Sequence, residues 1–323
     1  MKVCEWSELW LETIKGTVKE SSYRYSYYLP LKNHILPHFG EKELSEVKQF
    51  DIQIFLNKKG QTLARGTLIK FKQCLHRMFE TAVDNDIIAK NPCRNLRLSS
   101  KIPPQKKDVY TDEDVTYILK FAKQHRFGLD VTILLRLGLR RGELLGLKWE
   151  DIDYEKKTIS IKRAVADVPD QDTGKMKVII DTPKTMYSVR TIPVPNDILE
   201  WLKNTPQEKI IGKDIKRKKE GRIVKTEFII SNSAGTVCAP RTWSRRHYDM
   251  FMDEMIQHYA ELGIIIQKLN PHELRHTCAT LLVNDNKNLL AIANFLGWRD
   301  LQMLRERYAH MTTDAMREML ELD

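Results

Sequence analysis

The sequence contains little cysteine, and its arrangement suggests neither a disulfide framework nor a zinc finger. The five cysteines are odd in number, dispersed along 323 residues, and never form a Cys-x-x-Cys pair. We therefore expect reduced thiols that are mostly buried in the fold. The positions are Cys4, Cys74, Cys93, Cys238 and Cys278.

Long apolar runs and glycine-rich phosphate loops are also missing. No stretch approaches the roughly 20 apolar residues of a membrane helix, and the N-terminus lacks the apolar segment of a secretion signal. Neither G-x-x-x-x-G-K-[ST] nor G-x-G-x-x-G occurs, which argues against a nucleotide-driven enzyme. These absences predict a cytosolic or nuclear protein that needs no nucleotide cofactor and has no membrane partner.

Positive charge prevails in the chain. Lys and Arg number 53 against 43 Asp and Glu, which gives a net charge of +10, and half of that excess lies in residues 1–100. A basic surface favours a polyanion, because neutralising phosphates releases condensed counterions. Charge alone fits a basic protein without such a partner equally well. By composition, the Lys-rich residues 213–225 are typical of a solvated loop.

The length allows about two domains. Residues 98–108 (LSSKIPPQKKD) show no periodicity and indicate a linker. Helical apolar spacing precedes this stretch. We therefore predict an all-helical domain over residues 1–98, a linker over 99–108 and a second domain over 109–323. The helices expected in the first domain cover residues 6–17, 22–36, 45–58 and 63–84.

The second domain combines helical segments with a few strand signals. Thr111 and Asp114 resemble a capping box that opens a helix, and a following helix over residues 131–137 breaks at Gly138. Alternating or β-branched residues then predict three short antiparallel strands, and helical periodicity returns from residue 241. The expected fold class is mainly α with a small antiparallel β-sheet. The strands are expected at residues 158–163, 178–180 and 189–194.

The segment His272 to His276 (HELRH) formally satisfies H-E-x-x-H, the signature of zinc hydrolases. Asn270 and Pro271 indicate a helix start, however, so His272 lies in the first turn rather than in mid-helix. No third ligand motif follows, and Arg275 would place a cation beside the metal. A zinc hydrolase therefore remains the least favoured alternative.

The same segment also contains His272 and Arg275, one helical turn apart at a helix start, a combination that suits a phosphate. Other motifs accompany it: GLRRGELLGLKW at residues 138–149, LGW at 296–298 and YAH at 308–310. Taken together and in this order, they resemble the tyrosine recombinases, the phage and transposon integrase family. The resemblance covers about residues 109–310 and, more loosely, the helical N-terminal domain.

The resemblance implies a catalytic set. Arg140 and Arg275 resemble the family's paired arginines on the scissile phosphate, where two guanidiniums neutralise transition-state charge. Tyr308 resembles the nucleophile that leaves a 3′-phosphotyrosyl link. Apart from the resemblance, Arg140 fits a surface arginine and Tyr308 one of 11 tyrosines packed at a helix edge.

Three further residues complete the implied set. His272 would accept and donate a proton, and Lys184 would protonate the leaving 5′-oxygen, although Lys175 and Lys177 are nearby. Trp298 stands where many relatives carry histidine; its indole can donate a hydrogen bond but cannot shuttle protons. Glu143 is expected to orient Arg140 or His272, or else to be a plain helix glutamate.

The resemblance also implies an architecture and partners. The N-terminal domain would be a core-binding domain that clamps double-stranded DNA with the catalytic domain, in the bacterial cytosol or nucleoid. Recombination would need a tetramer on two DNA sites but neither metal nor cofactor. A C-terminal helix over residues 312–322 would dock either on a neighbouring protomer or on its own domain. The sequence does not indicate the DNA target, the direction of the reaction or the accessory proteins. It also leaves open whether an N-terminal arm-binding domain is missing and whether the chain is instead a catalytically idle DNA-binding relative.

Overall fold

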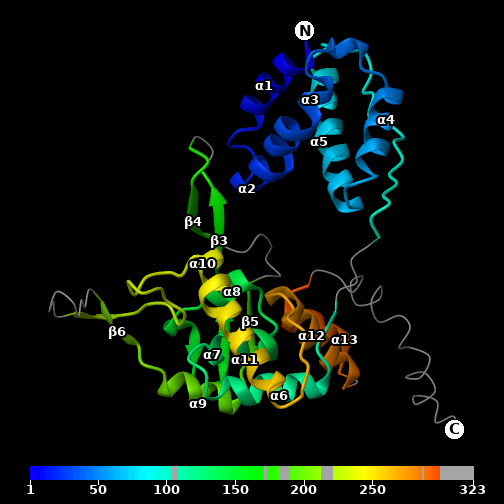
Figure 1. The fold of residues 1–323 in the computed structure, drawn as a ribbon. Helices are drawn as coiled ribbons and strands as arrows, with labels where there is room; N and C mark the ends of the chain where they lie inside the picture. Colours follow the sequence, from blue (N-terminus) through cyan, green and yellow to red (C-terminus); the bar gives the residue numbers. More distant parts are fainter. Residues whose placement is uncertain (104–107, 171–172, 182–188, 212–220, 286, 299–323) are drawn as a thin grey trace. The chain divides into compact units, whose positions relative to one another are not determined.

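The computed structural model divides into two units (Figure 1). It describes residues 1–103, 108–170, 173–181, 189–211, 221–285 and 287–298. Unit 1 comprises Met1–Lys106 and Val168–Lys177, and unit 2 comprises Lys107–Asp167 and Val178–Asp323. No helix in this described part is long and apolar enough to cross a membrane.

Residues 1–98 of unit 1 are built from helices, and the four predicted helical segments are confirmed with shifted ends. The second of them is a succession of short helical pieces, two of which have π-helical hydrogen bonding. In chain order the elements are α1 (Val3–Ile14), α2 (Glu20–Ser22), η1 (Tyr23–Tyr28), η2 (Leu31–Ile35), α3 (Leu36–Phe39), η3 (Leu44–Glu46), α4 (Gln49–Lys59) and α5 (Arg65–Asp84).

Two tryptophans join α1 to α5 in the core of unit 1. Trp6 and Trp10 lie one turn apart on α1 and are both buried. Their indole N–H groups donate to the Met78 carbonyl and to the Thr81 hydroxyl of α5, each at 3.1 Å. The rings thus bury apolar area while their polar atoms stay paired.

The first residues of the predicted linker pack on unit 1. The Ser100 hydroxyl donates to the Leu63 carbonyl at 2.8 Å, and the Lys101 amide donates to the Gly60 carbonyl at 2.9 Å. Chain beyond α5 is therefore tied to the turn between α4 and α5 at least as far as residue 101.

Unit 2 is mainly helical with small sheets, which confirms the predicted fold class. In chain order its elements are α6 (Asp112–Ala122), α7 (Gly128–Leu137), α8 (Arg141–Leu145), η4 (Trp149–Asp151), β1 (Ile152–Asp153), β2 (Thr158–Ile161), β3 (Ala164–Pro169), β4 (Met176–Asp181), β5 (Arg190–Pro193), α9 (Asn196–Asn204), β6 (Glu208–Ile211), β7 (Arg222–Lys225), α10 (Pro240–Trp243), η6 (Ser244–Tyr248), α11 (Asp249–Ala260), α12 (Pro271–Asn284) and α13 (Leu289–Leu296). The ends of β3 and β4 around their turn group with unit 1.

The strands differ from the simple three-stranded prediction. The three-stranded sheet has the order β1-β2-β5, whereas β4 pairs with β3 in a separate two-stranded sheet and β6 pairs with β7 in another. The predicted solvated loop over residues 213–225 is wrong at its end, because β7 occupies residues 222–225; residues 213–220 lie outside the described part. Pairing between distant segments leaves little trace in local periodicity.

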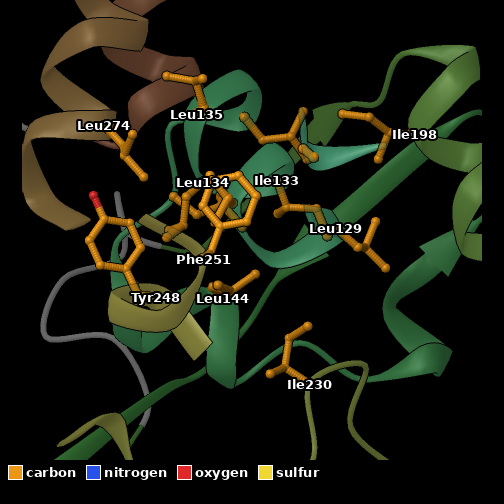
Figure 2. Close-up of a cluster of buried hydrophobic side chains, with 14 of the residues drawn as sticks. Leu129, Ile133, Leu134, Leu135, Leu144, Ile198, Ile230, Tyr248, Phe251 and Leu274 are labelled. Carbon is orange, nitrogen blue, oxygen red and sulfur yellow. The ribbon is translucent and has the colours of Figure 1, made fainter. Parts of the chain in front are cut away.

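The core of unit 2 surrounds α7, which is buried on nearly every side (Figure 2). A helix that is apolar on most of its sides belongs in the interior. Ile133 and Leu134 face residues from several elements, including Phe251 of α11 and Leu274 of α12, in the same cluster. The buried α7 is thus a fixed base for the turn that follows it. The cysteines are all free and four of them are buried, as expected.

Candidate active site

A glycine ends α7 and directs the chain into α8. Gly138 has φ +60°, the left-handed conformation that helices commonly adopt just beyond their last turn. Arg140 then precedes α8, and its amide donates to the Glu143 carboxylate at 3.0 Å. This side-chain cap holds Arg140 and Glu143 one turn apart.

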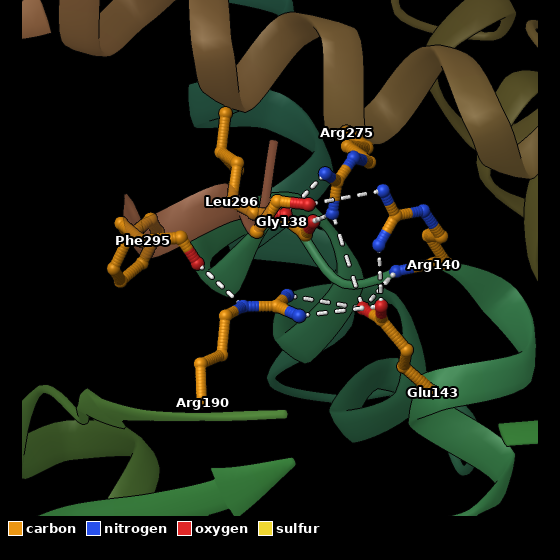
Figure 3. Close-up of polar contacts among 8 residues, drawn as sticks. Gly138, Arg140, Glu143, Arg190, Arg275, Phe295 and Leu296 are labelled. Atoms are coloured by element: carbon orange, nitrogen blue, oxygen red, sulfur yellow. Dashed lines mark hydrogen bonds and ion pairs between the residues drawn. The ribbon is translucent and has the colours of Figure 1, made fainter. Parts of the chain in front are cut away.

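Glu143 is the centre of a charged cluster (Figure 3). The carboxylate is buried and accepts from Arg140 Nη1 at 2.6 Å and from both terminal nitrogens of Arg190 at 3.2 and 3.0 Å. Arg275 Nη1 lies 3.9 Å from it. Within the described ranges, one carboxylate thus faces three guanidiniums, which gives this part of the cluster an excess of positive charge that suits an anion.

The pKa of Glu143 reflects two opposed effects. Burial alone would raise this pKa, because it penalises the charged form. The hydrogen bonds and charge of Arg190, followed by the charge of Arg140, outweigh burial and hold the pKa below its ordinary value. The carboxylate therefore stays ionised at neutral pH and keeps its arginines paired.

Helix α12 supplies Arg275, and its start forms as the sequence predicts. Asn270 caps the helix by accepting from the His272 amide at 3.0 Å, and Pro271 occupies the first helical position. Arg275 is 1% exposed and donates to the carbonyls of Gly138, at 2.7 Å, and of Leu296 (Figure 3).

Burial, and after it the charge of Arg140, lowers the pKa of Arg275 to about 9. The guanidinium therefore remains a cation at neutral pH although burial and a like charge oppose it. An anion beside Arg275 would stabilise the protonated guanidinium.

The C-terminal end of α13 closes the cluster. Gly297 follows α13 with φ +65°, and its carbonyl accepts from Arg140 Nη2 at 3.3 Å. The ring of Trp298 comes next in the chain, with its centroid 5.5 Å from the Arg275 guanidinium carbon. The fold thus brings together Arg140, Arg275 and Trp298, although Arg140 and Trp298 are 158 positions apart in the sequence.

Family models match most of the chain. The phage integrase family model matches residues 109–314, and the model for the N-terminal SAM-like domain of phage integrases matches residues 3–60. The chain belongs to the phage integrase family. The predicted family is confirmed, and this integrase is a site-specific recombinase of the tyrosine class that mobile elements use.

Individual relatives agree with this assignment. The integrase is 29% identical over 293 residues to a tyrosine recombinase XerC-like protein of Caldanaerobacter subterraneus subsp. tengcongensis, across 84% of this chain and 69% of the relative. It is 26% identical over 296 residues to the transposase from transposon Tn916 of Enterococcus faecalis, across 88% and 68% of the two chains.

Solved structures share the fold. The Tn1549 transposon integrase in complex with a circular intermediate DNA has a TM-score of 0.77 at 24% identity, covering 99% of both chains. A lambda integrase tetramer bound to a Holliday junction has a TM-score of 0.62 at 17% identity, covering 93% of this chain and 78% of that one. At these identities the likeness concerns the fold alone.

The zinc-hydrolase alternative finds no support in the integrase. The Glu273 carboxylate, which would be the catalytic base, instead accepts from the Asn270 amide at 2.8 Å and so caps α12. The rings of His272 and His276 lie 4.6 Å apart, edge to face, but within the described ranges no cluster of three or more His, Cys, Asp or Glu residues could hold a metal ion.

Two predicted site residues, Lys184 and Tyr308, lie outside the residues that the structure describes, as does the predicted helix over residues 312–322. Sequence reasoning missed Arg190 as a member of the cluster. A signal was present, because Arg190 stands two positions before the buried Ile192 on one strand and therefore on the same face of it. A charged residue on a buried face needs a buried partner.

Gly138 offers a test of the turn that positions the arginines. A Cβ at this position would lie 2.4 Å from Leu296 Cδ2 and 3.1 Å from Cys278 Sγ, in addition to the unfavourable φ. We expect Gly138→Ala to lower the free energy of unfolding by about 2–4 kcal/mol in urea denaturation. Gly263→Ala is the matched control, since it has φ +77° but open space, and should lose about 1 kcal/mol. Equal losses would mean that the contact with α13 is unimportant.

Proposed function

We propose that this integrase cuts and rejoins double-stranded DNA through a covalent 3′-phosphotyrosyl intermediate on Tyr308. The phenolate oxygen would bond to phosphorus while the bond from phosphorus to the 5′-oxygen breaks, and that oxygen would leave as a hydroxyl after taking a proton. The observation that carries the proposal is the arginine cluster around Glu143, a preorganised cationic site that suits a phosphodiester.

Arg140 and Arg275 would stabilise the charge that builds on the non-bridging oxygens. The Arg140 side chain is 39% exposed and is accessible to DNA, whereas Arg275 is buried and would add its charge from beneath. Their hydrogen bonds to Glu143 and to backbone carbonyls fix both before substrate arrives, so little reorganisation is needed during the reaction. Each such donor contributes on the order of 10²- to 10³-fold to rate in comparable sites.

The remaining roles follow from chemistry at the same place. Lys184 would protonate the leaving 5′-oxygen, and His272, in the first turn of α12, would accept and return the nucleophile's proton. Trp298 would pack against Arg275 and offer its indole N–H to a phosphate oxygen. No step calls for a metal or an organic cofactor.

We further propose residues 1–98 as the core-binding domain, 99–108 as the linker and 109–323 as the catalytic domain. The match of residues 3–60 to the N-terminal domain of phage integrases supports this division. Since one tyrosine cuts one strand, exchange would require a tetramer on two DNA sites, and the lambda integrase tetramer on a Holliday junction supports that assembly. The reaction would take place in the bacterial cytosol or nucleoid.

A trapping experiment tests the reaction. The full chain would be incubated in EDTA with nicked duplexes that carry the ends of the mobile element that encodes it. Covalent protein–DNA adducts would then be mapped by peptide mass spectrometry. We expect a 3′-phosphate linked to residue 308. An adduct at another residue would overturn the choice of nucleophile. Binding to these ends without an adduct would favour a catalytically idle DNA-binding relative.

A further inference from the structure

Three successive carbonyls at the end of α13 each accept a hydrogen bond from a different arginine. Arg190 Nε donates to Phe295 O at 2.7 Å, Arg275 Nη2 donates to Leu296 O, and Arg140 Nη2 donates to Gly297 O at 3.3 Å (Figure 3). The same three arginines face Glu143. The negative end of one helix and one carboxylate therefore hold all three guanidiniums together.

Arg190 differs from the other two in what its nitrogens do. It directs both terminal nitrogens to Glu143 and Nε to α13, and its side chain is 7% exposed. A guanidinium engaged on both edges in this way has little left to offer a substrate. Its backbone is fixed as well, because Arg190 pairs with Ile161 in the sheet.

We propose that Arg190 is a positioning residue, which holds the Glu143 carboxylate and the end of α13 so that Arg140 and Arg275 meet the scissile phosphate in a fixed geometry. The inference rests on the proposed function for its catalytic consequence. It assigns a role in the reaction to a strand residue outside the catalytic set, acting through Glu143 rather than on DNA.

Removing Arg190 should change how Glu143 titrates. Among the residues that the structure describes, the charged groups that face this carboxylate are Arg140 from the start of α8, Arg275 from α12 and Arg190 from β5. The thiol of Cys278, beside Arg275, stays neutral because burial raises its pKa to about 12. Arg190 is the strongest influence that lowers the pKa of Glu143, so without it burial dominates and the carboxylate becomes protonated at higher pH.

The first test measures single-turnover cleavage of a nicked duplex at saturating DNA between pH 5 and 8.5. We expect Arg190→Gln to cleave about 100-fold more slowly than wild type at pH 6, which is the scale expected for a small misplacement of catalytic groups. The difference from wild type should be smaller at pH 8. The acid limb of the profile should move to higher pH, while DNA affinity changes less than about threefold. Arg190→Lys should recover part of the rate, because lysine restores the positive charge but cannot donate to both carboxylate oxygens as the guanidinium does.

Arg163→Gln is the matched control. Arg163 likewise joins a buried carboxylate, that of Asp151, to a backbone carbonyl, that of Gly146, but outside the cluster. It should lose stability without moving the acid limb. An Arg190→Gln profile lowered equally at every pH would overturn the proposal and leave only a structural role.

A second readout is independent of cleavage. With 5-fluorotryptophan incorporated, the ¹⁹F resonance of Trp298, assigned with Trp298→Phe, reports on the end of α13. In Arg190→Gln it should titrate between pH 5 and 7, and adding Glu143→Gln should abolish that titration. The wild-type resonance should stay constant over this range. A resonance that also stays constant in Arg190→Gln would overturn the proposal. This result does not depend on cleavage, so failure of the positioning role can be told apart from failure of the proposed function.

Discussion

Tyr308→Phe should bind element ends with unchanged affinity and form no covalent adduct. Phenylalanine retains the ring but lacks the oxygen that would attack phosphorus, so no other change is expected at the site. Loss of a covalent nucleophile slows enzymes by on the order of 10⁴-fold or more, which places the variant below detection. Nicked duplexes in EDTA, resolved by denaturing electrophoresis, give the measurement.

Tyr154→Phe is a suitable control for this experiment. Its ring lies 5.3 Å from the Lys203 ammonium, a contact that phenylalanine preserves, and it stands outside the arginine cluster. Adduct yield should match wild type. If the adduct persisted in Tyr308→Phe, a different side chain would be the nucleophile, and the arginine cluster would still mark where the phosphate binds.

Arg275→Gln should slow cleavage by on the order of 10³-fold and also destabilise the fold. The substitution removes one of two cations expected at the phosphate. It also deprives the Gly138 and Leu296 carbonyls of their donor. Buried acceptors left without partners cost about 1–3 kcal/mol each, so urea denaturation should report a loss of about 2–6 kcal/mol. Single-turnover cleavage below the unfolding transition measures the catalytic part.

Arg163→Gln again separates stability from chemistry. This arginine is 17% exposed and should lose about 1–3 kcal/mol when its pair with Asp151 is broken, with cleavage within about threefold of wild type. Comparable slowing by Arg163→Gln and Arg275→Gln would show that instability, and not loss of charge at the phosphate, explains both variants.

Local signals explain most of what the sequence predicts correctly. Asn270 and Pro271 indicate the start of α12, and Thr111 with Asp114 that of α6, because a cap forms among residues close in the chain. Gly138 likewise indicates the end of α7. Arg140 and Arg275 were expected at one site from their motifs and family resemblance, and the structure brings them together around Glu143.

Non-local partners explain what sequence reasoning missed. The β-branched Val178 predicts a strand, but nothing near it indicates that β3 rather than β2 is its neighbour. Arg190 is similar, since its partners Glu143 and Phe295 are 47 and 105 positions away. The roles of Lys184 and Tyr308 rest on motif order and remain predictions.

Phe295, Leu296 and Gly297 at the end of α13 contribute to the arginine cluster through their backbone carbonyls. Every amino acid offers the same carbonyl, so Phe295 and Leu296 look like ordinary apolar positions in any comparison of sequences. Their number and helical phase matter instead, because one inserted residue would turn each later carbonyl by about 100°. The integrase thus keeps part of its arginine cluster in the length of a helix, where exchange of the Phe295 or Leu296 side chain leaves the backbone carbonyls in place.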